Sequence, residues 1–120
     1  VVVLERTNFR YFDPASIDEK PSFICIDVSF ISLGLILPVA AALLADAKGE
    51  LVALVKPQFE AGREQVGKGG IVRDPSIHAE VIEKVRGYAA GCGLAAVSTV
   101  ESPIKGAKGN TEFLMRCIHG

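Results

Sequence analysis

Two ionisable side chains follow apolar runs, a placement that can build a chemical site. Asp27 ends an apolar run that begins after Ser22, and Lys56 follows the uninterrupted apolar run 51–55. Both runs are typical of buried parallel strands, and the carboxyl ends of such strands border the ligand crevice of an open α/β sheet. If the two strands are neighbours, the carboxylate and the ammonium can meet.

A third candidate, Glu112, lies near the start of the final apolar segment, 111–118. If this strand runs antiparallel to its neighbours, its start lies at the same edge of the sheet as their carboxyl ends. A lysine between two carboxylates is oriented, and it can polarise a substrate hydroxyl or, when desolvated, accept its proton. The spacing is equally compatible with an ion-pair cluster that merely stabilises the edge of the sheet.

Two glycine-containing loops carry further cations. The loop 62–70 contains Arg63 and Lys68 among its glycines, and the loop 105–110 contains two lysines, the first of which is Lys105. Consecutive backbone N–H groups in such loops can cradle a phosphate. No G-K-[ST] sequence is present, which excludes a Walker loop. Solvated loops without a ligand are the alternative.

The histidines and cysteines do not indicate a metal or redox site. His78 falls in a predicted helix without a partner, and no ligand spacing matches a metal centre. The three cysteines, Cys25, Cys92 and Cys117, form no C-x-x-C pair and stand in apolar surroundings. We therefore expect buried, reduced thiols of a cytoplasmic protein.

The composition is that of one small domain. Its 120 residues have a net charge of −1, which excludes attraction of nucleic acid by a global basic field. The mean hydropathy of +0.34 predicts that part of the surface packs against something else. No apolar run is long enough to span a membrane and no signal peptide is evident, which favours a cytoplasmic location. The first residue is not methionine, so we expect a fragment of a longer chain.

The order of predicted elements is that of an α/β protein. Strands are expected at residues 1–4, 22–28, 51–55, 94–100 and 111–118, and helices from about residue 35 to 44 and from 75 to 90. The alternating first part predicts a parallel sheet, and the last two strands are expected to be antiparallel neighbours. Pro38 requires either that the first helix begins near Leu35 or that it is kinked. That helix is apolar on nearly all faces, so we expect it to pack on more than one side.

Four segments closely resemble one known family. They are V-V-V-L-E-R-T-N at 1–8, I-D-V-S-F-I-S-L at 26–33, L-V-K-P-Q-F-E-A-G-R-E-Q-V-G-K-G-G-I-V-R-D-P at 54–75 and S-P-I-K-G-A-K-G-N-T-E-F-L at 102–114. Together they resemble the TlyA family, whose members are often called hemolysin A and are related to the FtsJ ribosomal RNA methyltransferases. The resemblance extends over essentially the whole chain, and its K-P-Q-F-E-x-G-R run is highly specific.

The resemblance implies ribose 2′-O-methylation of ribosomal RNA, free or in a ribosomal subunit, with S-adenosylmethionine as cofactor. It also implies a catalytic Lys-Asp-Lys-Glu set, of which three members fall on Asp27, Lys56 and Glu112. Asp27 and Asn8 would line the cofactor. The candidates for holding RNA phosphates are Arg63, Lys68, Arg73 and Lys105.

The fold that the resemblance implies is an incomplete Rossmann-like methyltransferase fold, a mostly parallel α/β sheet with helices on its faces and an antiparallel last strand. Residues 1–120 would be the C-terminal portion of that domain. The first catalytic lysine, the glycine-rich cofactor loop and an S4-type RNA-binding domain lie upstream in the family, so we expect the fragment alone to be inactive. In the family's strand order, 3-2-1-4-5-7-6, the strand at 22–28 would become an open edge through which chains can associate as homo-oligomers.

Two other functions are weighed against this one. A non-catalytic module that binds RNA or phosphate through its two loops is the alternative. A membrane-active hemolysin is disfavoured, because the apolar helix at 33–45 carries no basic polar face.

Overall fold

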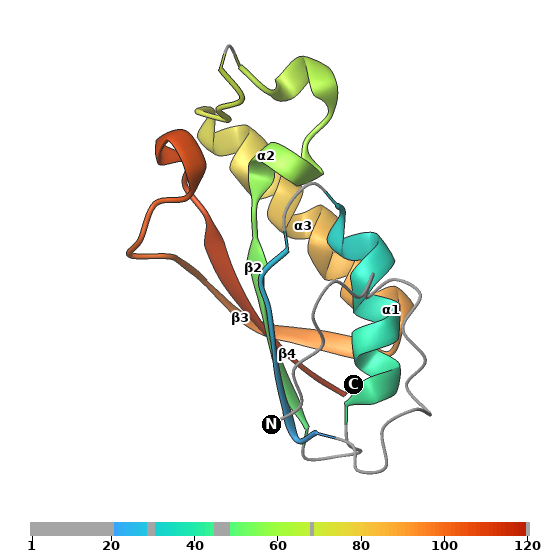
Figure 1. The fold of residues 1–120 in the computed structure, drawn as a ribbon. Helices are drawn as coiled ribbons and strands as arrows, with labels where there is room; N and C mark the ends of the chain where they lie inside the picture. The colour runs from blue at the N-terminus through green and yellow to red at the C-terminus, as the bar shows by residue number, and fades with distance from the viewer. Residues whose placement is uncertain (1–20, 29–30, 45–48, 68, 120) are drawn as a thin grey trace.

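The computed structural model describes residues 21–28, 31–44, 49–67 and 69–119 (Figure 1). The strand expected at 1–4 lies outside these residues, as do the two predicted site residues Asn8 and Lys68. Within the described part, a four-stranded sheet packs against two long helices.

The four strands form one mixed sheet. They are β1 (Phe23–Ile26), β2 (Glu50–Val55), β3 (Leu94–Glu101) and β4 (Phe113–His119). Their order is β1-β2-β4-β3; β1 pairs with β2 in parallel, and β4 runs antiparallel to both of its neighbours. Of the described strands, β1, β2 and β3 therefore share one direction and β4 is reversed. This confirms the predicted parallel arrangement with an antiparallel last strand.

Among the described strands, β1 forms one edge of the sheet and β3 the other. This order agrees with the last four strands that the resemblance implies, in which the final strand inserts between two earlier ones. The strand β1 is shorter than predicted and ends at Ile26, so Asp27 stands just beyond it. Association of two chains through the β1 edge stays a prediction.

The helical elements are α1 (Leu33–Leu43), α2 (Pro57–Glu60) and α3 (Pro75–Gly91), with two 3-10 turns, η3 (Arg63–Gln65) and η4 (Ala107–Gly109). The predicted start of α3 is confirmed, because the Asp74 side chain accepts a hydrogen bond from Ser76 N at 2.9 Å. Pro75 takes the first helical position, where its missing N–H has little effect. The single turn α2, which directly follows Lys56, was not predicted.

The helix α1 differs from its prediction in two respects. It begins two residues before Leu35, because the Ser32 hydroxyl caps it by accepting a hydrogen bond from Gly34 N at 3.0 Å. Pro38 therefore lies inside the helix, where it removes a backbone donor. Leu35, Pro38 and Ala42 are exposed, so α1 has one broad buried side and one solvent side instead of packing on more than one side.

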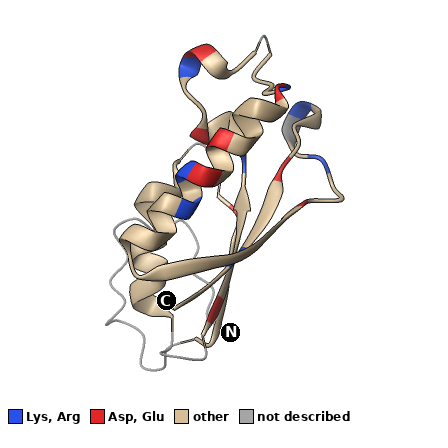
Figure 2. Ribbon diagram, turned by 180° about the vertical axis from the view of Figure 1, so that it is seen from behind, with Lys and Arg blue, Asp and Glu red and all other residues tan. Residues whose placement is uncertain are grey.

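A single core lies between the helices and one face of the sheet. Alternate residues of β2, Leu51, Ala53 and Val55, are buried on this face, and Met115 and Cys117 are register partners of two of them on β4. Apolar side chains of α1 and α3 complete the same cluster. Both long helices therefore pack against this face, as the views from the front and from behind show (Figures 1 and 2).

The cysteines are only partly as predicted. Cys117 is buried, and burial raises the pKa of its thiol to about 11, which keeps it protonated at neutral pH. Cys92 is half-buried, and burial raises its pKa as well. Cys25 is exposed, which contradicts the prediction of a buried thiol. The reason is strand alternation: Ile26 faces the core, so its neighbour Cys25 faces away from it.

Two helix glycines test the packing of α1 against α3. A methyl group on Gly34 would lie 3.1 Å from the Tyr88 ring, whereas one on Gly87 would meet nothing within 4 Å. Gly87→Ala should therefore stabilise the protein by about 0.5–1 kcal/mol through helix propensity, and Gly34→Ala should give no such gain because of the crowding. Urea unfolding followed by circular dichroism measures both. Equal stabilisation by the two variants would contradict the close contact.

Candidate functional site

The carboxyl ends of β1 and β2 bring an ammonium and a carboxylate together. Ile26 pairs with Ala53 in a parallel register, so both strands leave the sheet at the same edge. There Lys56 Nζ lies 2.6 Å from Asp27 Oδ1. The Lys56 side chain is 12% exposed, whereas the Asp27 side chain is 69% exposed. The lysine is therefore held against the protein by a carboxylate that still faces solvent.

Glu112 reaches the same edge from the reversed strand. Val55 pairs with Phe113, so Lys56 and Glu112 are the next residues beyond that pair on the two strands. Glu112 is 5% exposed, and its Oε2 accepts a hydrogen bond from Gln58 Nε2 at 2.9 Å. The topology thus gathers the three residues that the sequence singled out at one edge of the sheet.

A glycine determines where the Glu112 carboxylate can lie. A Cβ atom on Gly106 would overlap with that carboxylate, so the carboxylate packs directly on the Gly106 backbone. Two backbone hydrogen bonds fix this loop: Gly106 N donates to Asn110 O, and Ser102 N donates to Glu112 O, both at 2.8 Å. The sequence placed Gly106 in a loop that could cradle a phosphate, and it did not indicate this contact with Glu112.

Glu60 is a buried carboxylate that sequence reasoning missed. It is 4% exposed, and it accepts hydrogen bonds from Ser32 Oγ at 2.7 Å and from Leu33 N at 2.8 Å. Burial raises the pKa of Glu60, while the bonds from Leu33 and Ser32 oppose the rise. Glu60 thereby ties α2, which follows Lys56, to the start of α1, which follows Asp27 along the chain. The only signal in the sequence was an acid within the specific K-P-Q-F-E run.

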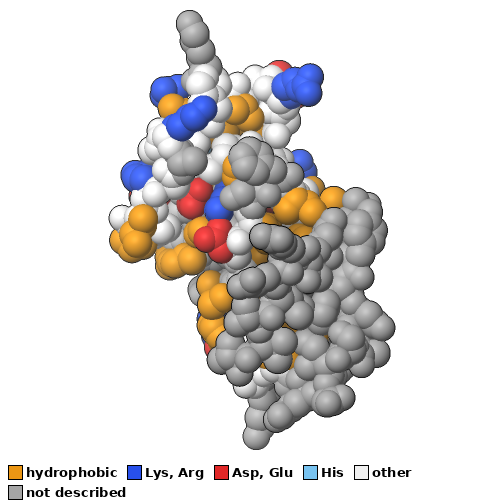
Figure 3. All heavy atoms as spheres, in the orientation of Figure 1, with side chains coloured by type: hydrophobic (Ala, Val, Ile, Leu, Met, Phe, Trp, Pro, Cys, Tyr) orange, Lys and Arg blue, Asp and Glu red, His pale blue; other side chains and the backbone are white. Residues whose placement is uncertain are grey.

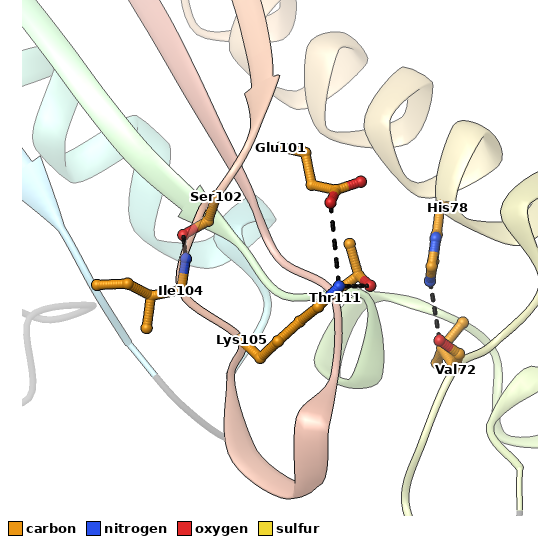
Figure 4. Close-up of polar contacts among 7 residues, drawn as sticks. All are labelled: Val72, His78, Glu101, Ser102, Ile104, Lys105 and Thr111. Carbon is orange, nitrogen blue, oxygen red and sulfur yellow. Dashed lines mark hydrogen bonds and ion pairs between the residues drawn. The ribbon is translucent and has the colours of Figure 1, made fainter.

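Three of the predicted cationic residues, Arg63, Arg73 and Lys105, are among the described residues and lie at the same end of the molecule as these carboxylates. Figure 1 shows α2, η3, the start of α3 and η4 at one end, and Figure 3 shows Lys and Arg side chains around it. Arg63 and Arg73 are exposed there. Lys105 is exposed too, but it donates to Thr111 Oγ1 at 2.9 Å and lies 3.9 Å from Glu101 Oε2 (Figure 4). The neighbouring carboxylate neutralises part of its charge.

One buried amide joins the two glycine-containing loops. Asn110 is 2% exposed; its Oδ1 accepts a hydrogen bond from Val72 N at 2.9 Å, and its Nδ2 donates to Gly70 O at 3.0 Å. His78 Nε2 donates to Val72 O at 2.8 Å (Figure 4). The His78 ring meets that of Phe113 edge-on, with the ring centroids 5.5 Å apart. His78 is therefore a packing residue with partners, which corrects the prediction that it has none.

The part of the chain that the structure describes offers neither a metal site nor a membrane-spanning helix. It contains no group of three or more His, Cys, Asp and Glu side chains placed to hold a metal ion. Nor does any helix among these residues combine the length and the apolar composition needed to cross a bilayer.

Substitution of Glu60 tests its role at the start of α1. Glu60→Ala leaves the buried Leu33 N–H without an acceptor and should destabilise the protein by about 1–3 kcal/mol. Glu60→Gln keeps an acceptor and removes the buried charge. Burial raises the pKa of Glu60 in the folded state above 4.5. The contribution of Glu60 to the free energy of unfolding of wild type is therefore greatest below pH 4.5, and it falls as the pH rises through the raised pKa.

Glu60→Gln should therefore gain stability relative to wild type between pH 4.5 and pH 7, a window that begins at the ordinary pKa of the group. Urea unfolding at several pH values measures this difference. The account of Glu60 is wrong if wild type instead gains stability relative to this variant as the pH rises.

Several known proteins are similar to this chain in sequence. The chain matches the FtsJ-like methyltransferase family over residues 1–117. It is 55% identical to the proposed rRNA methyltransferase YqxC of Bacillus subtilis, an alignment that covers 96% of this chain and 41% of that protein. It is 42% identical to the 16S/23S rRNA (cytidine-2′-O)-methyltransferase TlyA of Mycobacterium tuberculosis, where the alignment covers 96% of this chain and 42% of that protein.

A solved structure agrees with the sequence comparison. The crystal structure of a proposed hemolysin from Lactococcus lactis has a TM-score of 0.93 and 51% identity to this chain, and the alignment covers 99% of this chain and 57% of that one. The chain spans less than half the length of YqxC and TlyA. Since the family match covers residues 1–117, which include Asp27, Lys56 and Glu112, the chain belongs to the FtsJ-like methyltransferases.

Proposed function

We propose that this chain carries the ribose-activating part of a cytoplasmic, S-adenosylmethionine-dependent 2′-O-methyltransferase that acts on ribosomal RNA or a ribosomal subunit. The observation that carries the proposal is the 2.6 Å contact of Lys56 with Asp27 at the edge where Glu112 is buried. The name of one relative, the 16S/23S rRNA (cytidine-2′-O)-methyltransferase TlyA of Mycobacterium tuberculosis, supports the same reaction.

The chemistry follows from the properties of a ribose hydroxyl, which is a poor nucleophile because it is hardly ionised at neutral pH. A lysine ammonium beside its oxygen stabilises the negative charge that grows as the proton leaves, and a neutral lysine can accept that proton. Asp27 and Glu112 would orient Lys56, because carboxylates on two sides restrict its long side chain. Accurate positioning of the hydroxyl and the methyl group then supplies much of the rate enhancement.

S-adenosylmethionine would supply an electrophilic methyl group on a positively charged sulfur. Among the described residues, Asp27 fits this group best. Its side chain is 69% exposed while one oxygen binds Lys56, so it presents negative charge toward the side from which a cation can approach. Asn8 keeps its predicted place beside the cofactor as a proposal for a residue outside the described part of the chain.

The loops beyond Lys56 are proposed to hold RNA phosphates. Arg63 and Arg73 are exposed at this end, and Lys105 is held there by its contacts. Lys108 adds a cation from the second loop and lies beside the first loop: its Nζ is 3.8 Å from the point where a Cβ atom on Gly70 would lie. Lys68 is proposed for the same role. Contacts of this kind weaken as salt is added, since phosphate binding releases counterions.

The role of Lys56 is tested with protein expressed from the complete reading frame. Lys56→Ala should lower methyl transfer from labelled S-adenosylmethionine to ribosomal subunits by about 10²–10⁴-fold. The fold should persist, because Asp27 stays solvated when its partner is removed. Lys56→Arg should also be impaired, since a planar guanidinium does not replace an ammonium. Arg86→Ala, an exposed cation on α3, is the control. Wild-type activity of Lys56→Ala would exclude the proposed role.

Gly106 offers a test that leaves the three site residues unchanged. Gly106→Ala places a methyl group where the Glu112 carboxylate lies, in a backbone conformation that alanine also adopts. The carboxylate must move, so methyl transfer should fall by about tenfold or more through misplacement. Gly87→Ala is the matched control, because its methyl group meets nothing within 4 Å. Equal rates for the two variants would separate Glu112 from the reaction.

A further inference from the structure

The single turn α2 is fixed on the side that faces the core. Its last residue, Glu60, is bound by the start of α1, and its first residue, Pro57, is fully buried. Phe59 N donates to Lys56 O at 2.9 Å, which locks the turn onto the end of β2. Gln58, one of the two residues between the first and the last, is therefore part of a rigid turn that begins after Lys56.

The two ends of the Gln58 amide are unequally satisfied. Its Nε2 donates to Glu112 Oε2 at 2.9 Å, while its buried Oε1 has no hydrogen-bond partner among the described residues. Turning the amide over would set Oε1 against the carboxylate, so electrostatics selects the orientation with the NH₂ group toward Glu112. A buried acceptor without a donor is destabilising, and such an atom calls for an explanation.

The explanation lies in the surroundings of Glu112. Its carboxylate packs against the Gly106 backbone, which blocks movement in that direction. The Gln58 amide adds a charge-assisted hydrogen bond to one carboxylate oxygen, and bonds of this kind are short and directional. The Gly106 backbone and the Gln58 amide together restrict the rotation of the Glu112 carboxylate at the edge of the sheet where Lys56 also lies.

We propose that Gln58 is a positioning residue of the methyl-transfer site, whose amide holds the Glu112 carboxylate in the orientation in which it acts on Lys56. This inference rests on the proposed function of the site. Gln58 acts through Glu112, and its unpartnered Oε1 is the structural consequence of directing the NH₂ group at the carboxylate.

Gln58→Met tests the proposal, since methionine has a similar length and cannot hydrogen-bond to the carboxylate. In protein from the complete reading frame, kcat should fall by about tenfold to a hundredfold, as expected for a misplaced catalytic group. The KM for ribosomal subunits should stay within about twofold, because RNA contacts are untouched. In a Glu112→Gln background, Gln58→Met should have no further effect on kcat, because the group through which it acts is already altered.

Two outcomes would overturn the proposal. One is an unchanged kcat in Gln58→Met. The other is a double variant in which the kcat losses of Gln58→Met and Glu112→Gln multiply. That result would mean that Gln58 stabilises the fold independently of Glu112. Glu83→Met is the matched control: the Glu83 side chain has the same length as that of glutamine, but it is exposed on α3, where it lies 3.7 Å from Arg86 Nε. Its kcat should equal that of wild type.

The same proteins separate this inference from the proposed function. If wild type transfers no methyl group to RNA, the proposed function is wrong. The urea midpoints of wild type, the two single variants and the double variant then decide the remaining question. Midpoint shifts that are smaller in the double variant than the sum of the single shifts support the Gln58–Glu112 contact. Additive shifts overturn it.

Discussion

The burial of two carboxylates beside the end of β2 is the constraint on which this site depends. A carboxylate withdrawn from water destabilises the fold unless donors replace the lost hydration. Glu60 finds donors in Ser32 and Leu33 at the start of α1, and Glu112 finds one in Gln58. Gln58 and Glu60 both belong to the single turn α2, so these hydrogen bonds restrict its movement. Because α2 begins directly after Lys56, the same contacts determine where the lysine leaves the sheet.

The two carboxylates around Lys56 are in different environments, which suggests different tasks. Asp27 is largely exposed and stands at the edge strand of the described sheet, so it is open to a ligand. Glu112 is buried and faces the amide of Gln58 and the backbone of Gly106. On the proposed function, a substrate hydroxyl would approach from the side of Asp27, and Glu112 would support the lysine from within the protein.

The loops beyond the site form one framework, although they lie far apart in the sequence. Both backbone polar groups of Val72 are bound by side chains, its N–H by Asn110 and its carbonyl by His78. Asn110 also holds Gly70. Cations that lie close together repel one another, so loops that carry several of them are stabilised by such fixed support. The buried Asn110 amide provides it from a position two residues before Glu112.

The sequence by itself determined the elements whose signals are local. An apolar run followed by a charge marked the ends of β1 and β2 at Asp27 and Lys56, and Asp74 before a proline marked the start of α3. The resemblance supplied the order of the strands, and the structure agrees with it. The capping role of Ser32 was also a local signal, but Pro38 drew the prediction to a later start of α1.

Only the tertiary structure decided which side chains meet. Gln58 reaches Glu112 across 54 positions in the chain, Val72 reaches Asn110 across 38, and Ser32 reaches Glu60 across 28. No local pattern contains such pairs, because they follow from the insertion of β4 beside β2 and from the hydrogen bonds that Glu60 accepts at the start of α1. The contact between Gly106 and Glu112 has the same origin. Apolar periodicity and capping depend on neighbours within one turn or strand, whereas partners and burial depend on how distant elements pack.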